Sequence, residues 1–161
     1  MLVHILAVRP QEQSRDRTMD AGQPKRILIG KVGLDGHDRG AKFIVHALRN
    51  AGYEVIYTGI RRTPEQIVRT AVDEDVDVIG LSLLSGAHKE LFTRVAELLK
   101  AEDAAGIMLF AGGIIPEQDI PYLKSLGFRH VFTPGTPLSE ILRALEAELA
   151  NQPAADSEAD S

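Results

Sequence analysis

The stretch Arg26-Ile-Leu-Ile-Gly-Lys-Val32 is the part of the sequence that decides the fold. Its apolar character is nearly continuous, which is typical of a strand buried on both faces of a sheet. The amphipathic segment 38–51 follows and ends before Gly52, a pattern that predicts a helix with a glycine stop. A buried strand followed by a helix is the repeating unit of a parallel sheet, so this pair indicates an α/β fold.

The strand-and-helix unit recurs along the chain. Further strands are predicted over 54–58, 77–82, 107–110 and around 130–132, and further helices over 64–74, 87–101, 116–125 and 137–150. The second helix has the clearest start, because Thr63 as N-cap, Pro64 at the first helical position and Gln66 form a capping box. Five such units with right-handed crossovers predict a doubly wound, flavodoxin-like (Rossmann-like) sheet of five parallel strands in the order 2-1-3-4-5.

Differences in composition predict the domain organisation. Residues 1–24 are either a flexible arm or an extension that docks on a partner chain, because the stretch 9–24 is polar and aperiodic. Residues 25–150 contain the repeated units and form the binding domain. Residues 151–161 are rich in Ala, Asp, Ser and Glu, which predicts a disordered acidic tail. The first residues lack a basic leader, so no signal peptide is expected.

Composition excludes several classes of function. The 161 residues include 18 Lys and Arg against 23 Asp and Glu, for a formal charge of −5, so no basic surface for nucleic acid is expected. Five Phe, three Tyr and no Trp leave few rings on which bases could stack. No segment has the roughly 18 consecutive apolar residues of a membrane span. The absence of Cys excludes disulfides and thiolate metal sites, and it fits a reducing cytoplasm.

The loops beyond the carboxyl ends of the strands are where a doubly wound sheet binds its ligands. The loops predicted there are rich in Gly, Ser, Thr or Pro and cover 33–38, 82–87, 111–116 and 133–137. The loop after the second strand carries Arg61 and Arg62, which are either solvated or contact a partner. Gly33, Gly36 and Gly40 do not have the G-x-G-x-x-G spacing of dinucleotide sites, so a nicotinamide cofactor is disfavoured.

Asp35 and His37 are the strongest candidates for chemistry. In an extended loop, a carboxylate two residues away can accept a hydrogen bond from one imidazole nitrogen and leave the other free to bind a metal. Lys31, at the end of the first strand, could pair with Asp35 and keep it ionised. The other histidines are scattered, whereas an ordinary divalent ion needs three or four protein ligands. A metal that needs a single protein ligand fits better, such as cobalt in a corrin ring.

Three motifs resemble the signature of cobalamin-binding domains, D-x-H-x-x-G followed by S-x-L and G-G. They are Asp35-x-His37-x-x-Gly40, Ser82-x-Leu84 and Gly112-Gly113. The sequence around these motifs, including Pro134-Gly135-Thr136, is similar to that of the acyl-CoA mutase branch of this family. The branch comprises methylmalonyl-CoA, isobutyryl-CoA and 2-hydroxyisobutyryl-CoA mutases. The resemblance extends over about residues 26–149.

The resemblance implies a role for each motif. Cobalamin would bind with its benzimidazole base detached and with His37 as the lower axial ligand of cobalt, while Asp35 orients His37 and Lys31 completes the relay. The detached base would enter a slot in which Ser82 donates a hydrogen bond to a ring nitrogen and Leu84 packs. The implied cofactor-binding residues are Gly33, Asp35, Gly36, His37, Asp38, Arg39, Gly40, Ser82, Leu84, Ser85, Gly112, Gly113, Thr133, Gly135 and Thr136.

The resemblance also implies a function. The chain would be the cobalamin-binding small subunit of a cytoplasmic, adenosylcobalamin-dependent acyl-CoA mutase, and a separate barrel subunit would hold the acyl-CoA. The substrate could be methylmalonyl-CoA, 2-hydroxyisobutyryl-CoA or isobutyryl-CoA.

A corrinoid carrier for methyl transfer and a cobalamin-sensing module are the alternatives, although neither a preceding helical module nor a DNA-binding element is encoded here. A phosphoacceptor receiver is disfavoured because Ser82 stands where a receiver has Asp. His88, beside these loops, is either structural or faces the corrin.

Overall fold

The computed structural model describes residues 24–31, 39–83 and 88–151. Residues 24–135 form one compact unit, while 136–151 belong to a second unit that contains α6 (Leu138–Ala150). Residues 1–23 and 152–161 lie outside the described part, so the predicted arm and tail stay predictions. None of the helices described is long and apolar enough to cross a membrane.

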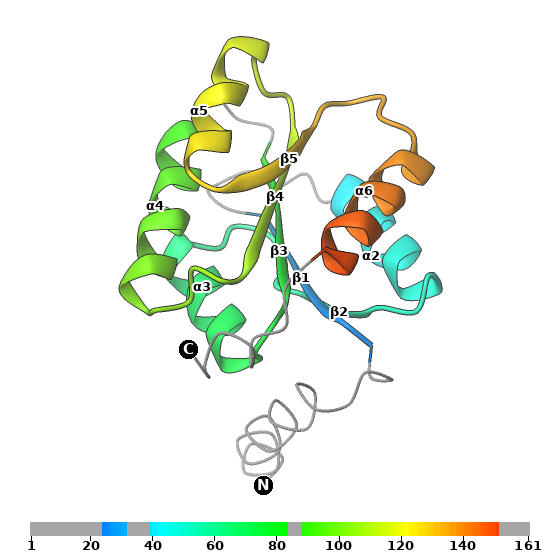
Figure 1. Cartoon of the computed structure of the whole chain (residues 1–161), viewed down its shortest axis with the longest axis horizontal. Coiled ribbons are helices and arrows are strands. Elements are labelled where there is room, and N and C mark those ends of the chain that lie inside the picture. Colours follow the sequence, from blue (N-terminus) through cyan, green and yellow to red (C-terminus); the bar gives the residue numbers. More distant parts are fainter. Residues whose placement is uncertain (1–23, 32–38, 84–87, 152–161) are drawn as a thin grey trace, which may run out of the picture. The chain divides into compact units, whose positions relative to one another are not determined.

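The sheet of the first unit has the predicted topology. Its five strands are β1 (Arg26–Lys31), β2 (Glu54–Tyr57), β3 (Val78–Leu83), β4 (Met108–Gly113) and β5 (Phe128–Phe132). All neighbouring pairs are parallel, and the order is β2-β1-β3-β4-β5, which confirms the flavodoxin-like prediction (Figure 1). The reversal of strand order between β1 and β3 is where folds of this class place their ligands.

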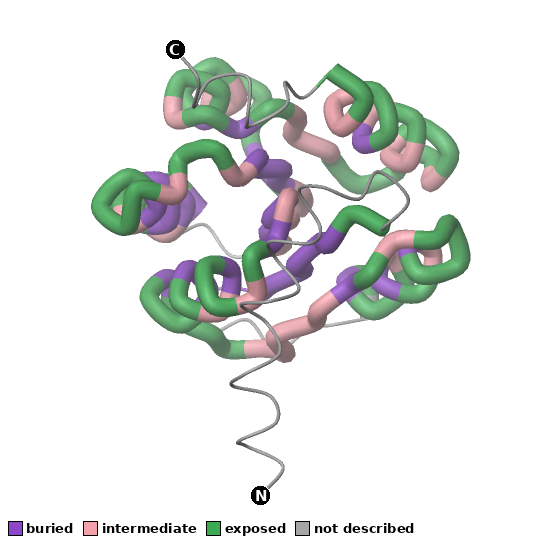
Figure 2. Tube along the Cα trace, turned by 60° about the horizontal axis from the view of Figure 1, so that its bottom comes forward, coloured by how far each residue is buried: buried purple, intermediate pink, exposed green. Residues whose placement is uncertain are grey.

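Helices cover both faces of this sheet. They are α2 (Arg39–Asn50), α3 (Pro64–Asp73), α4 (His88–Ala101), the 3₁₀ turn η1 (Glu117–Asp119) and α5 (Ile120–Ser125). Figure 1 shows α3, α4 and α5 on one face and α2 on the other. We refer to these faces as the α4 side and the α2 side. In Figure 2 the central strands are buried and the outer turns of the helices are exposed.

The start of α3 confirms the predicted capping box. The Gln66 backbone N–H donates to Thr63 Oγ1 at 3.1 Å, and the Thr63 N–H donates to Gln66 Oε1 at 3.0 Å. Pro64 occupies the first turn, where its missing N–H leaves no helical bond unmade. Local sequence alone therefore fixes where this helix begins.

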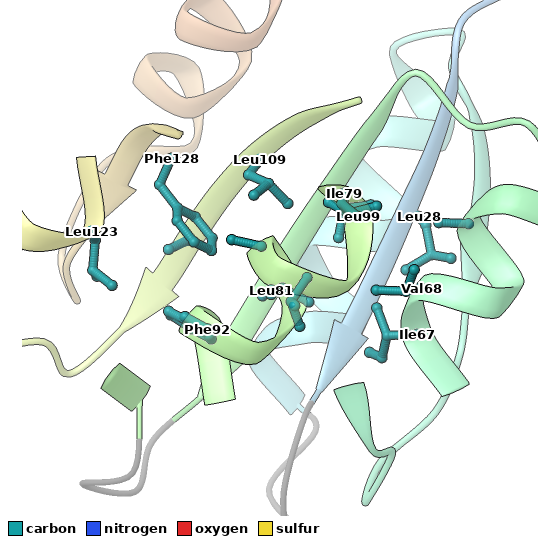
Figure 3. Close-up of a cluster of buried hydrophobic side chains, with 14 of the residues drawn as sticks. Leu28, Ile67, Val68, Ile79, Leu81, Phe92, Leu99, Leu109, Leu123 and Phe128 are labelled. Atoms are coloured by element: carbon teal, nitrogen blue, oxygen red, sulfur yellow. The ribbon is translucent and has the colours of Figure 1, made fainter. Parts of the chain in front are cut away.

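The hydrophobic core on the α4 side is closely packed. Figure 3 shows strand residues Leu28, Ile79, Leu81 and Leu109 meeting side chains of α3, α4 and α5. The Phe92 and Phe128 rings stack with centroids 5.2 Å apart. Gly30 of β1 has no room for a side chain, because a Cβ there would overlap Ile67 Cδ1. This side of the sheet is thus filled by the protein itself.

A charged cluster closes the amino edge of the sheet. Arg26 is 5% exposed, and its guanidinium donates from Nε to Glu54 Oε1 at 3.1 Å and from Nη1 to the Glu74 carbonyl at 2.6 Å. The Arg26 backbone N–H donates to Asp77 Oδ2 at 2.8 Å. These bonds join the starts of β1 and β2 to the segment that connects α3 with β3, and they satisfy a charge that would be costly to bury alone.

Several element bounds differ from the sequence prediction by one residue, and two elements differ by more. The fourth strand was expected over 107–110, but β4 continues to Gly113, since Ser82 pairs with Gly112 and Leu83 with Gly113. Pairing with β3 overrides the low strand propensity of glycine. The helix expected over 116–125 is divided into η1 and α5, with Pro121 in the first turn of α5.

Candidate functional site

A row of residues crosses the sheet near the carboxyl ends of its strands. In the register of the ladders, Lys31 pairs with Ser82, Ser82 with Gly112 and Gly112 with Phe132. Neighbouring strands lie about 4.8 Å apart, so these four residues, which we call the edge row, are close in space. The structure therefore brings together Lys31, Ser82 and Gly112, three of the residues predicted from widely separated motifs.

The edge row faces the α2 side. Leu28, Leu81 and Ala111 belong to the core cluster on the α4 side. Successive side chains of a strand point to opposite faces. Lys31, three residues after Leu28, and Ser82, directly after Leu81, therefore face the α2 side.

A second row lies one step deeper on the same side. Ile29 pairs with Gly80, Gly80 with Phe110 and Phe110 with His130. A Cβ on Gly80 would come within 2.9 Å of Ile29 Cδ1, so only glycine fits there without a shift. Where β3 and β4 run side by side, the two rows thus carry the small residues Gly80, Ser82 and Gly112 together with the buried ring of Phe110.

Aromatic rings lie beside these small residues. The Phe110 ring is 5.4 Å from His130 and 6.1 Å from Phe132 between centroids. The His130 and Phe132 rings are 5.7 Å apart and nearly parallel, at 4°. Phe110 is buried, whereas His130 and Phe132 are half-buried. We call Phe110, His130 and Phe132 the aromatic cluster.

Lys31 is the most deeply buried cation in the described part of the chain, with 2% of its surface exposed. Its carbonyl accepts a hydrogen bond of 3.1 Å from the Arg62 N–H, which holds the end of β1 against the segment after β2. A buried ammonium needs a carboxylate or several acceptors near it. Asp35, the carboxylate predicted to pair with it, lies outside the described residues.

The Ser82 hydroxyl is the other polar group of the edge row. Ser82 is half-buried, and no residue that the structure describes hydrogen-bonds to its side chain. A half-buried hydroxyl can donate one hydrogen bond and accept others. It can therefore serve a ring nitrogen of a ligand on the α2 side.

His88 belongs to the opposite side of the sheet. It opens α4 and is buried, like Phe92 and Leu99, on the face of α4 that carries the core. Its Nε2 lies 2.8 Å from Asp119 Oδ2, and its Nδ1 has no hydrogen-bond partner among the residues that the structure describes. Of the two interpretations from sequence, this placement favours the structural one, because it links the start of α4 to η1.

The remaining predicted residues are distributed as follows. Gly33, Asp35, Gly36, His37, Asp38, Leu84 and Ser85 lie outside the described residues. Arg39 and Gly40 open α2, and Gly113 ends β4. Thr133 and Gly135 are exposed in the segment after β5, and Thr136 belongs to the second unit. The roles given to these residues stay predictions.

Sequence reasoning missed the second row. The signal for Gly80 was present, since a lone glycine inside the apolar run Val78-Ile-Gly-Leu-Ser82 is typical of a close approach. Phe110, His130 and Phe132 gave no such signal, because only the register of β4 against β5 places their rings together.

Proteins of known activity resemble this chain over most of its length. It is 46% identical over 127 residues to the 2-hydroxyisobutanoyl-CoA mutase small subunit of Aquincola tertiaricarbonis, covering 79% of this chain and 93% of that one. It is 42% identical over 131 residues to the methylmalonyl-CoA mutase of Escherichia coli K12, covering 81% of this chain. The chain spans only 18% of that much longer relative.

Solved structures and family membership agree with these relatives. A cobalamin-binding protein from Desulfitobacterium hafniense shares the fold, with a TM-score of 0.67 at 19% identity over 77% of this chain and 58% of that one. Residues 25–143 match the B12 binding domain. Because this match takes in every strand of the sheet and far more than half of the sequence, the chain belongs to the B12 binding domain family.

Proposed function

We propose that this chain is the cobalamin-binding subunit of a two-subunit, adenosylcobalamin-dependent acyl-CoA mutase, and that it is inactive without its partner. The observation that carries the proposal is the edge row, in which Lys31 meets Ser82 and Gly112, residues of two separate motifs of the family, on one side of the sheet. The near-complete overlap with a mutase small subunit supports the two-subunit arrangement. The class of reaction is an isomerisation of a carbon skeleton.

The residues present fit the cofactor. The tail of cobalamin ends in a benzimidazole, which is planar and apolar on its faces and has one ring nitrogen that accepts a hydrogen bond. On the α2 side of the edge row, Gly112 carries no side chain and Ser82 has a hydroxyl to donate, while the Ile29 side chain lies over the neighbouring Gly80. Such a combination of small residues and one polar group suits a flat heterocycle.

Three residues would hold the metal end of the cofactor. His37 would ligate the cobalt, Asp35 would accept a hydrogen bond from the other imidazole nitrogen, and the buried ammonium of Lys31 would keep Asp35 ionised. A carboxylate partner increases the electron donation of an imidazole, so Asp35 and Lys31 would tune the ligand strength of His37. When bound, the cofactor supplies the cobalt–carbon bond whose homolysis starts radical rearrangements.

The rest of the proposed site surrounds the corrin and the nucleotide. In the sequence, Leu84 and Ser85 come directly after β3, and Thr133, Gly135 and Thr136 come after β5; we assign the hydroxyls and backbone N–H groups of the latter three to a phosphate and a ribose. The residues of the first loop and of the start of α2 complete the set: Gly33, Gly36, Asp38, Arg39 and Gly40.

The acyl-CoA would be held by a large barrel subunit. The substrate is then chosen by that partner, with methylmalonyl-CoA, 2-hydroxyisobutyryl-CoA and isobutyryl-CoA as the candidates. We also propose a cytoplasmic location, which the absence of cysteine in the full sequence supports. Fractionation of the producing cell checks this, and recovery outside the cytoplasm would contradict it.

A spectroscopic titration tests cofactor binding. Adding adenosylcobalamin to the purified chain should give the spectrum of a corrinoid whose own base is detached and replaced by imidazole. His37→Ala should lose the imidazole-ligated spectrum, and about ten- to a hundredfold in affinity by analogy with losses of metal ligation. His46→Ala, on the exposed face of α2, is the matched control and should behave as wild type. An unchanged spectrum for His37→Ala would rule out axial ligation by this residue.

A further inference from the structure

We propose that His130 is a specificity-determining residue that selects the heteroaromatic base at the end of the cofactor's tail. This inference rests on the proposed function, because it requires the tail to bind on the α2 side. It goes further, because it names the residue, a histidine in β5, that distinguishes corrinoids with different bases on their tails.

The first argument is the position of the ring. His130 pairs with Phe110, one step below the edge row, and Phe110 in turn pairs with Gly80. A flat group that enters over Ser82 and Gly112 and continues along β3 and β4 therefore comes alongside this level of the sheet. His130 is half-buried there, so part of its surface is exposed to a ligand.

The second argument is the contrast between the two sides of the sheet. On the α4 side, Leu81, Leu109 and Phe92 fill the space between strands and helix. On the α2 side, the same stretch of β3 and β4 carries Gly80, Ser82 and Gly112 together with the buried ring of Phe110. Among the described residues, the positions of Ser82 and Gly112 are therefore where a planar ring can approach the backbone on the α2 side, next to Phe110.

The third argument is the rigidity and chemistry of the aromatic cluster. His130 is held by contacts with Phe110 at 5.4 Å and with Phe132 at 5.7 Å between centroids. Because Phe110 and Phe132 also contact each other, at 6.1 Å between centroids, His130 packs against a pair of rings that restricts the orientation of its plane and its edge. Its apolar faces favour stacking with another aromatic system, while its ring nitrogens distinguish bases by the polar groups at their edges.

Comparison of three corrinoids provides the test. Cobalamin carries the benzimidazole, an adenine-tailed analogue carries a purine, and cobinamide lacks the nucleotide altogether. Dissociation constants are measured by absorbance titration for wild type, His130→Ala, His130→Phe and the exposed control His46→Ala, with thermal unfolding recorded for each variant. His130→Phe keeps an aromatic ring in the cluster, so it can still be tested if His130→Ala does not fold.

We expect His130→Ala to bind cobalamin about tenfold more weakly, as befits the loss of one aromatic contact. Its affinity for cobinamide should stay within about twofold. His130→Phe should retain affinity for cobalamin but change the preference between benzimidazole and adenine tails, because a ring without nitrogens presents a different edge. An equal loss for cobalamin and cobinamide, no loss for either, or an unchanged preference in both variants would overturn the proposal. If wild type binds none of the three corrinoids, the proposed function itself fails.

Discussion

At the scale of single residues, small side chains decide what the sheet can hold. Gly30 and Gly80 lie on neighbouring strands and face opposite sides of the sheet. At each of them an added Cβ would overlap an isoleucine side chain, that of Ile67 in α3 at Gly30 and that of Ile29 in β1 at Gly80. On the α4 side the missing side chain lets a helix approach. On the α2 side it makes room for the side chain of Ile29 on the neighbouring strand.

Replacing Gly30 tests this close packing. Gly30→Ala should lower the free energy of unfolding by about 1–3 kcal/mol, because the new methyl group overlaps the buried Ile67 side chain. Ile67→Val removes the overlapping Cδ1, so the double variant should be more stable than the sum of the single changes predicts. Equilibrium urea denaturation measures the free energy of unfolding of the two single variants and of the double variant.

Gly106→Ala is the matched control for this cycle. A Cβ at Gly106 meets nothing within 4 Å, so the variant should unfold like wild type. Strictly additive effects of Gly30→Ala and Ile67→Val would show that the destabilisation has another origin.

At the scale of elements, the sequence predicted most of the fold but less of the site. The capping box at Thr63 and the alternation of strands and helices depend on residues close in the chain, and both were confirmed. The extension of β4 to Gly113 was not predicted, because it depends on pairing with β3, more than twenty residues away. The pairing of Phe110 with His130 escaped prediction for the same reason.

The link between α3 and α4 gives stability a dependence on pH. Glu65 lies in the first turn of α3, and its carboxylate accepts a hydrogen bond from Arg94 Nε of α4 at 3.1 Å. A hydrogen bond from the helix backbone, and then Arg94, hold the pKa of Glu65 below its usual value. A lowered pKa in the folded state stabilises the protein above the unfolded-state pKa of glutamate, and this contribution disappears as the pH falls through the folded value.

Glu65→Gln should therefore be less stable than wild type near neutral pH and approach it near pH ~3. Because Glu65 is exposed, we expect a small difference in Tm, which differential scanning calorimetry at both pH values would measure. Glu97→Gln, which contacts Arg94 from within α4, controls for the loss of a surface charge. An equal difference in Tm between Glu65→Gln and wild type at both pH values would contradict the conclusion that ionised Glu65 causes the pH dependence.

At the scale of the whole molecule, the proposed function requires a second chain. A carbon-skeleton mutase must hold its acyl-CoA against the cofactor, and the described part of this chain consists of one sheet with its helices. The Aquincola relative is named a small subunit, whereas the Escherichia coli relative contains the matching region as 18% of one long chain. The same domain thus occurs both as a separate chain and as part of a longer one.

Reconstitution tests the dependence on a partner. With adenosylcobalamin and the candidate acyl-CoA esters, neither this chain nor a purified large mutase subunit should form product alone, and their mixture should. Product analysis by mass spectrometry identifies the substrate, and a single-chain methylmalonyl-CoA mutase serves as the positive control. Turnover by this chain alone would contradict the proposed division between subunits.

The Arg26 cluster has a consequence for how such a domain can diversify. Its bonds to Glu54, Glu74 and Asp77 secure the strand starts at the end of the sheet remote from the edge row. Substitutions of Arg26 or its partners would therefore weaken the strand starts without touching the edge row at the other end of the sheet. Descendants that keep this cluster could acquire new partner enzymes while inheriting the same scaffold.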